Sequence, residues 1–399
     1  MRSLYNAWSG TASHEVVVTP PAASPRMLSP AFVQVTIANF FFFLAFASFF
    51  LLPLHIRALG GSESEVGFIM GTGGLSGLAS VFVIGALLDR FGRRVFLRGG
   101  FVAMAVVSAA FLLCDRVGPA LYLLRGVQGL AFAAGFNAAA TLAAELAPPD
   151  RLAAALGLFG VSTLATHAIA PSLGELIVRW GGFDALFVVA ALYACTGAAI
   201  TWSLPVGHFR SPTARGRVRL TRALGSTVVA VALCGAAFGS VITFVPTYVQ
   251  TEHLGAVSTF FLSYTATAVM TRVVFGGISD SLGRRQVILP AMLLLAISIA
   301  LLADVHSTLA LAGTGLLFGT AQGFVYPTLN AFTVDQSTAG QLGRVQALYN
   351  GTFNLGVTLG SVALGPVVHD YGHRVMFLCS AGAALGALAV FGVGARRVA

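Results

Sequence analysis

Twelve apolar stretches of about twenty residues or more follow one another along the chain, and they constrain its fold more than any other feature. They run near 31–54, 64–88, 95–114, 119–147, 152–180, 183–204, 226–250, 257–279, 286–303, 307–334, 342–368 and 373–395. A helix of that length crosses the hydrocarbon core of a bilayer. Backbone groups find no water there, so each stretch is expected to be helical. We therefore predict an all-α membrane protein with twelve transmembrane helices.

The composition excludes other classes of protein. Hydrophobic residues make up 57% of the chain and charged residues 9%, whereas about a quarter of a soluble domain is charged. The alternation of a membrane β-barrel is absent from the sequence. The sequence has no phosphate-cradling loop, metal-ligand cluster or nucleophile elbow. We therefore expect no enzyme, no cofactor, no bound metal and no ATP-driven pump.

The net charge of +9 comes from arginine alone, because the sequence contains no lysine. Seventeen arginines fall in the tails and in alternate loops, four fall in the other loops, and two lie within spans. The positive-inside rule then places both termini in the cytoplasm. Such loop charge fits orientation and anionic lipid headgroups, so no nucleic-acid partner is expected. The exclusive use of arginine as the basic residue suggests a GC-rich genome and therefore a bacterium. We then expect the protein in the inner membrane.

Hydrophilic segments divide the chain into two halves. Residues 1–29 are polar and are expected to form a disordered cytoplasmic tail. Residues 205–225 carry five arginines and separate six spans from six. This segment is either a flexible linker between bundles 30–204 and 226–399, or a loop that only sets orientation. We expect the protein to be a monomer.

A charged motif occurs once in each half. Its first copy contains Gly85, Asp89, Arg90, Gly92, Arg93 and Arg94, and Gly276, Asp280, Gly283, Arg284 and Arg285 recur 191 residues later. Both copies lie between apolar stretches. An even number of spans in each repeat keeps the halves parallel, related by an axis along the membrane normal, with a substrate site expected near the midplane between them.

The two copies resemble the loops between helices 2 and 3 and between helices 8 and 9 of the major facilitator superfamily. Ser281 stands where that family commonly has a basic residue. The resemblance covers nearly the whole chain after about residue 30. It implies two pseudo-symmetric six-helix bundles that move small molecules by alternating access, most similar in character to bacterial drug and sugar efflux members.

The motif is expected to act as a gate. The glycines would allow close helix approach (Gly85, Gly276) or an unusual φ (Gly92, Gly283). By resemblance, Asp89 would bind the start of span 11 and Asp280 the start of span 5, where a helix N-terminus offers partial positive charge. The alternative is that these residues only set topology. Glu145 and Asp335, which end spans 4 and 10, are expected to join the arginines in charge clusters.

Four groups within spans 4, 5 and 8 are candidates for coupling or structure. Arg125 resembles the arginine of the family's helix 4 motif, which is linked to proton coupling, and we expect it to pair with Glu175 directly or through water, as a switch or a strut. His167 is either a proton relay or a hydrogen-bond partner of Thr163 or a carbonyl. For Arg272, a structural pairing near the motif is favoured over substrate binding. Pro171 resembles a reduced form of the helix 5 motif of antiporters.

Polar side chains within spans are expected to line the substrate site, because such residues face a bundle interior or a water-filled cavity. The candidates are Asn39, Gln128, Asn137, Tyr248, Tyr264, Gln322, Tyr326, Asn330, Gln346, Tyr349, Asn350 and Asn354. Of Phe40 to Phe43, one or two can line the site, because consecutive residues point in different directions around a helix.

Three functions are consistent with the sequence. The first is proton-coupled export of a small, partly apolar organic compound, as in an antiporter. The second is an uptake carrier or facilitator for an organic anion or a sugar. The third is a lipid-handling or receptor-like protein that moves no soluble solute.

Overall fold

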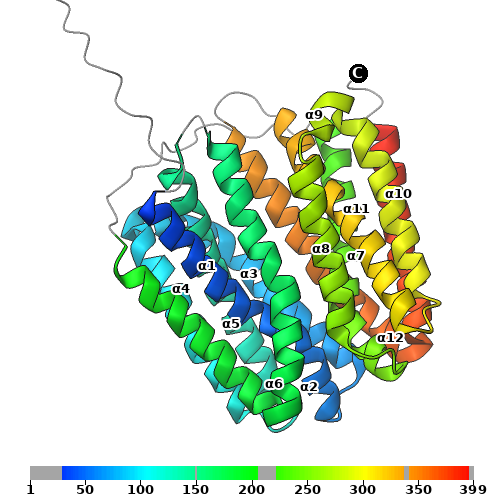
Figure 1. Cartoon of the computed structure of the whole chain (residues 1–399), viewed down its shortest axis with the longest axis horizontal. Coiled ribbons are helices and arrows are strands. Elements are labelled where there is room, and N and C mark those ends of the chain that lie inside the picture. Colours follow the sequence, from blue (N-terminus) through cyan, green and yellow to red (C-terminus); the bar gives the residue numbers. More distant parts are fainter. Residues whose placement is uncertain (1–28, 149–150, 205–221, 337–340, 395–399) are drawn as a thin grey trace, which may run out of the picture.

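The computed structural model describes residues 29–148, 151–204, 222–336 and 341–394, and every regular element in those ranges is a helix (Figure 1). Side chains at residues 81–83 and 85–91 lie outside the description. The first half contains α1 (Pro30–Ser48), η1 (Phe49–Leu51), α2 (Leu52–Ala58), α3 (Glu63–Phe91), α4 (Arg93–Ala110), η2 (Phe111–Leu113), α5 (Pro119–Leu146) and α6 (Leu152–Trp202). The second half contains α7 (Arg222–Thr251), α8 (Val257–Phe275), α9 (Ile278–Leu282), α10 (Arg284–Leu302), α11 (Thr308–Asp335) and α12 (Leu342–Gly394).

Two of these helices are long enough to cross a bilayer twice. Within α6, Gly182 has φ 70° and ψ −173°, and within α12, Gly372 has φ 82° and ψ 170°, so each long helix reverses at a glycine. Eight of the described helices are long and apolar enough to span a membrane, α6 and α12 among them. The all-α membrane fold is confirmed. The count of twelve spans remains a prediction.

Local sequence explains where several helices begin. Ser29 caps α1 by accepting a hydrogen bond from the Phe32 amide at 3.2 Å. Ser307 caps α11 by accepting one from the Ala310 amide at 3.1 Å. In the repeated motif, Gly92 has φ 86° and Gly283 has φ 93°. These values fall in the region that L-residues avoid, so the expected role of both glycines is confirmed.

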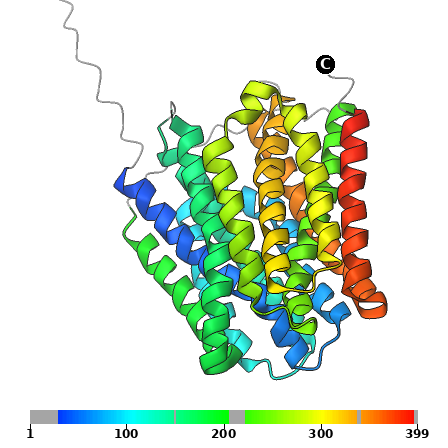
Figure 2. The same ribbon diagram turned by 45° about the vertical axis from the view of Figure 1, so that its right-hand side comes forward.

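The helices gather into two groups, which we call the N-lobe (α1–α6) and the C-lobe (α7–α12). Figure 1 shows the N-lobe in blue to green and the C-lobe in lighter green to red, and Figure 2 shows α1 and the end of α12 at opposite edges. Lobes meet where α3 packs on α12 and α6 packs on α8. Segment 205–221 and almost all of the tail 1–29 lie outside the described residues, so the linker and tail remain predictions.

Each lobe has its own packed interior. In the N-lobe, Phe42 is fully buried and stacks on Phe101 of α4 at 4.3 Å between ring centroids. In the C-lobe, Gly356 and Gly360 of α12 lie directly against the carbonyls of Ala232 and Ala236 in α7. Small residues at such crossings let membrane helices approach closely.

Candidate functional site

The molecule has two ends that differ in their contacts. We call the end with the turns at Gly92 and Gly283 the motif end, and the end with the turns at Gly182 and Gly372 the distal end. In Figure 1, α9 marks the motif end, which lies on the same side as the last turns of α12, drawn in red. At the distal end the lobes meet through two seams, which we name by their helices.

The α6/α8 seam is held by a carboxylate of the N-lobe that binds the first turn of a C-lobe helix. Glu175 of α6 accepts hydrogen bonds from the amides of Val257 at 2.6 Å and Ser258 at 2.8 Å. These are first-turn amides, which have no partner within their own helix. The N-cap position of α8 is Ala256, whose side chain cannot accept a hydrogen bond. A carboxylate from the N-lobe thus completes a helix of the C-lobe, where the helix dipole also favours negative charge.

The α3/α12 seam depends on close backbone contact instead. Gly67, Gly71 and Gly74 lie on one face of α3, and a Cβ at any of them would collide with Ser361, Val362 or Thr358 of α12. From the other side, Gly365 approaches α3 so closely that its Cβ would lie 3.1 Å from the Glu63 carbonyl and 3.2 Å from Gly67 Cα. The seam is therefore formed by the absence of side chains.

A buried polar cluster stands beside the α3/α12 seam. Thr247 Oγ1 of α7 lies 3.1 Å from Glu63 Oε2 and 3.0 Å from His373 Nε2 of α12. Arg57 Nε lies 3.4 Å from Glu63 Oε1. Glu63 and His373 are 6% and 9% exposed, so both need these partners. The sequence analysis did not predict this cluster. The available signal was an acid, Glu63, directly before the span 64–88 and a histidine, His373, at the first residue of the span 373–395.

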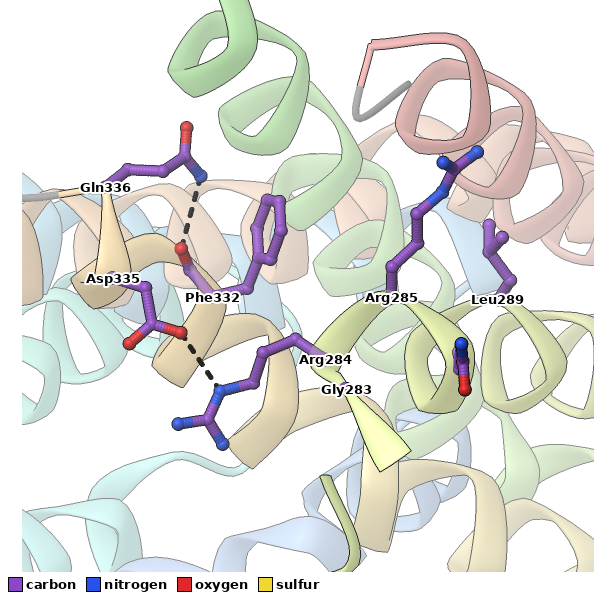
Figure 3. Close-up of a pocket in the computed structure, with 8 residues that line it drawn as sticks. Gly283, Arg284, Arg285, Leu289, Phe332, Asp335 and Gln336 are labelled. Carbon is purple, nitrogen blue, oxygen red and sulfur yellow. Dashed lines mark hydrogen bonds and ion pairs between the residues drawn. The ribbon is translucent and has the colours of Figure 1, made fainter. Parts of the chain in front are cut away.

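At the motif end the described ion pairs stay within one lobe. Arg93 pairs with Glu145, which joins α4 to α5. Arg284 Nε lies 3.0 Å from Asp335 Oδ2, which joins α10 to α11. The expected charge clusters are confirmed. Figure 3 shows Arg284 and Asp335 among the residues that line a cavity, together with Phe332 and Gln336. All of its lining residues belong to the C-lobe.

The expectation for Gly276 is wrong, and that for Asp280 is not met in this conformation. Asp280 does not contact α6 here: its side chain is 64% exposed and pairs with Arg284 one turn away, so its role when the motif end is closed stays a prediction. Gly276 does not admit a neighbouring helix; it is exposed at the end of α8, and its closest contact is the carbonyl of Arg272. The side chains of Gly85, Asp89 and Arg90 fall outside the described residues, so their gating role stays a prediction. Arg94 is exposed.

The expected pair of Arg125 and Glu175 is also wrong. Glu175 is held by the start of α8, and Arg125, which is 5% exposed, donates from Nη1 to Oε1 of Gln128 on its own helix. Arg125 lies against α3, where a Cβ at Gly73 would meet its carbonyl at 3.3 Å. The spacing along the two helices predicted that both residues lie at similar depth. Glu175 instead binds the two free amides at the start of α8, which no sequence pattern indicates.

Near the middle of the lobes, aromatic rings meet across the interface. His167 of α6 lies with Nδ1 3.4 Å from the Tyr264 hydroxyl of α8. Its ring also contacts Phe43 at 6.3 Å and Phe50 at 5.0 Å between centroids. Thr163, the expected partner of His167, instead accepts a hydrogen bond from Asn39 at 2.9 Å. Phe43 is thus the member of the phenylalanine run that contacts the interface histidine.

A second cluster lies in the C-lobe. The Tyr326 hydroxyl donates to Asn350 Oδ1 at 3.1 Å, and the Tyr349 hydroxyl donates to the Tyr326 carbonyl at 2.6 Å. Arg272 Cζ lies 5.7 Å from the Tyr326 ring centroid. Among the described residues Arg272 has this contact with Tyr326 and no ion pair, so the choice between a structural pairing and substrate binding stays a prediction. The Arg272 Nε has no hydrogen-bond partner among those residues.

The other expected lining residues are scattered. Tyr248 is at the distal end, where its hydroxyl donates to the Val305 carbonyl at 3.0 Å and its ring packs on Phe377. Asn39, Gln128 and Gln322 are buried, and Asn354 is exposed. The half-buried members are Asn137, Asn330 and Gln346. Whether these side chains contact substrate remains a prediction.

The sequence profile of the Major Facilitator Superfamily matches residues 35–360 and 255–398, which together cover most of the chain. This chain belongs to that superfamily. Among its relatives is the multi-drug resistance efflux pump PmrA of Streptococcus pneumoniae, 25% identical over 347 residues that cover 82% of this chain and 86% of PmrA. Another is the multidrug resistance protein MdtG of Klebsiella pneumoniae, 26% identical over 376 residues, covering 86% and 89%.

Solved structures of superfamily members share the fold. The nucleoside transporter NupG superposes with a TM-score of 0.71 at 14% identity, covering 92% of this chain and 99% of NupG. A bacterial homologue of the human lysosomal transporter Spinster, solved in an inward-facing and occupied conformation, gives 0.77 at 13% identity, covering 94% and 98%. This superfamily member is therefore a multi-pass membrane protein with the transporter fold.

Proposed function

We propose that this transporter exports a small, partly apolar organic compound across the inner membrane by alternating access, coupled to protons. The observation that supports it most is the contrast between the two ends of the molecule. At the distal end Glu175 of one lobe binds the start of α8 in the other, whereas Asp280 at the motif end pairs within its own lobe. Such one-sided contact, among the side chains that the structure describes, is expected of one of two alternating states.

The arginine distribution gives the orientation in this proposal. The motif end carries Arg93, Arg284 and Arg285, and the positive-inside rule assigns such loops to the cytoplasm. The distal end is then the outer side, and the described conformation is closed outside. For substrate to leave, both distal seams must open. The efflux relatives PmrA and MdtG support the outward direction.

His167 is our candidate for proton coupling, because it contacts Tyr264 of the other lobe from the middle of the first arm of α6, residues 152–181. It faces Tyr264 of α8 and the rings of Phe43 and Phe50. A proton gained or lost there changes the charge of the interface itself. Glu175, bound at the distal seam, acts as a latch.

Transport assays in proteoliposomes test this proposal. The probes are 1-naphthylmethylamine, 1-naphthamide and 1-naphthoate, which place a positive, neutral or negative group on one aromatic body. We expect at least one to exchange across the membrane and to accumulate against its gradient when a pH gradient is imposed. In His167→Gln, exchange should remain while the pH gradient no longer drives accumulation. Wild-type flux that ignores the pH gradient would exclude proton coupling, and the absence of any exchange would exclude transport of this class.

A further inference from the structure

We propose that Arg272 is the anion-binding residue of the substrate site, and that the transported compound is an aromatic organic acid whose carboxylate binds this guanidinium. The inference rests on the proposed function, because it takes the space between the lobes as the place where substrate binds. It then adds a chemical class, which the names of the efflux relatives PmrA and MdtG do not provide.

The described acids around Arg272 have other partners or lie far along the helices. Asp280, in the short helix α9 that follows α8, pairs with Arg284. The helices packed against α8 are α6, α11 and α7. Their acidic residues are Glu175 and Asp184 in α6 and Asp335 in α11, and α7 has none. Glu175 binds the first turn of α8, fifteen residues before Arg272 and thus about 22 Å away along the helix axis. Asp184 follows the distal turn, and Asp335 is paired at the motif end.

The helix that carries the Tyr326 partners leads to the same result. In α12, which contributes Tyr349 and Asn350, the acidic residue is Asp370, two residues before the distal turn at Gly372. No acid in these four helices therefore stands beside Arg272. Arg272 lies in the last turn of α8, where the helix dipole favours a cation but does not neutralise it. A guanidinium keeps its charge at any pH that proteins experience, so a half-buried one still needs an anionic partner. A substrate carboxylate would be that partner.

The Arg272 side chain contacts an aromatic ring. The side chain is half-buried and lies over the Tyr326 ring, a cation–π contact that compensates the charge only in part. Its Nε is buried without a hydrogen-bond partner among the described protein groups. Arg272 is carried by α8, the C-lobe helix that packs on α6 of the N-lobe. An unused donor thus lies on a helix that borders both lobes.

The aromatic part of the ligand would lie among rings from both lobes. His167 with Phe43 and Phe50 presents ring faces and edges from the N-lobe, and Tyr264 faces them from the C-lobe. Flat aromatic bodies pack well against such rings, by stacking or edge-to-face contact. A compound with its carboxylate on Arg272 and its ring among these side chains would touch both lobes. Binding would then bias the rocking motion, which a ligand of one lobe alone would not do.

Arg125 provides an internal contrast. It is the other arginine within a span, but it is 5% exposed, bound to Gln128 and packed against α3 inside the N-lobe. Its surroundings leave little room for a ligand. Of the two arginines, only Arg272 is partly exposed and carried by a helix that packs against the other lobe.

The test is binding to the purified, full-length protein in detergent, measured by calorimetry and by thermal shift. Probes are benzoate, 1-naphthoate and indole-3-acetate, each with its primary amide and its corresponding amine. We expect at least one carboxylate to bind about tenfold or more tightly than its matched amide and amine, as a charge-assisted pair predicts. Arg272→Gln should abolish that preference, and Arg272→Lys, which keeps the charge but not the two-pronged geometry, should retain part of it.

Arg116→Gln is the matched control, because Arg116 is exposed in the distal loop before α5. It should keep the wild-type preference. Thermal unfolding of each variant without ligand shows whether it folds; if Arg272→Gln does not, the Lys variant decides. No carboxylate preference across the panel, or a preference that survives in Arg272→Gln, would overturn the anion site. Because binding is measured without flux, its failure leaves the transport proposal standing, and a failure of transport leaves this result interpretable.

Discussion

The α6/α8 seam and the α3/α12 seam close the same end of the molecule by different chemistry. In the first, a carboxylate crosses between lobes to complete a helix that lacks its own cap. In the second, glycines bring two backbones together. The internal repeat relates these seams, since Pro366 stands 191 residues after Glu175. The repeat therefore conserves the meeting of helices and not the means by which they are held.

The starts of the two helices explain the difference. Helix α3 begins with a capping box, in which the Ser62 amide donates to Glu65 Oε2 at 2.8 Å and the Glu65 amide donates to Ser62 Oγ at 3.2 Å. Its first-turn amides therefore need no cap from α12. Helix α8 begins at Ala256 and borrows its cap from Glu175. The α3/α12 seam thus depends on the close packing of two backbones, whereas the α6/α8 seam depends on a charged hydrogen-bond contact that can be released.

The largest effect is expected from Gly67→Ala. Its new Cβ would lie 3.0 Å from Gly365 Cα and closer still to the Ser361 carbonyl, so α3 and α12 would have to separate. Overpacking of this kind costs about 1–3 kcal/mol. Spin labels at Trp180 and Thr251 should then report a longer distance between the lobes at the distal end. Gly99→Ala, with nothing within 4 Å of the added Cβ, is the control; equal distances in both variants would show that the glycine seam does not hold the lobes.

A smaller effect is expected from Glu175→Gln, which keeps the side-chain shape and removes its charge. Loss of a charged cap in a partly buried site costs about 1–2 kcal/mol. Hydrogen exchange at the Val257 and Ser258 amides should therefore accelerate about tenfold. The matched variant is Glu65→Gln, whose cap lies within one lobe, and it should accelerate exchange at Ser62 without affecting α8. Unchanged protection of α8 in Glu175→Gln would remove the latch from this seam.

The smallest effect is expected from giving α8 a cap of its own. The double variant Ala256→Ser with Thr259→Glu copies the capping box of α3 onto α8. Its first-turn amides would then have partners within the C-lobe, so adding Glu175→Gln should change their exchange by less than about threefold. The same addition in the wild-type background should give the full effect. If the graft does not reduce dependence on Glu175, the amides are protected by packing and not by the carboxylate.

The sequence predicted the architecture well because hydropathy and the repeated motif are both local signals. Span positions, the positive φ of Gly92 and Gly283, and the pairs Arg93–Glu145 and Arg284–Asp335 all follow from spacing along the chain. The superfamily resemblance also agrees with the profile match.

Contacts between lobes were predicted poorly. Glu175 was expected to bind Arg125, a residue of the adjacent helix in sequence, and instead it binds amides 82 residues later. Asp280 was expected at α6, which requires the other end of the molecule to be closed. Such contacts depend on which state is adopted and on backbone groups that have no residue signature. Sequence patterns specify side chains, and free amides at a helix start become visible only in the fold.

The most direct test of the alternating latch is a pair of distances measured together by electron paramagnetic resonance in nanodiscs, on a background without the four cysteines. One pair of labels, at Trp180 and Thr251, spans the distal end, and the other, at Leu152 and Leu282, spans the motif end; all four positions are exposed. In Glu175→Gln the distal distance should lengthen while the motif-end distance shortens. A distal opening with no change at the motif end, or no change at either, would contradict rocking controlled by Glu175.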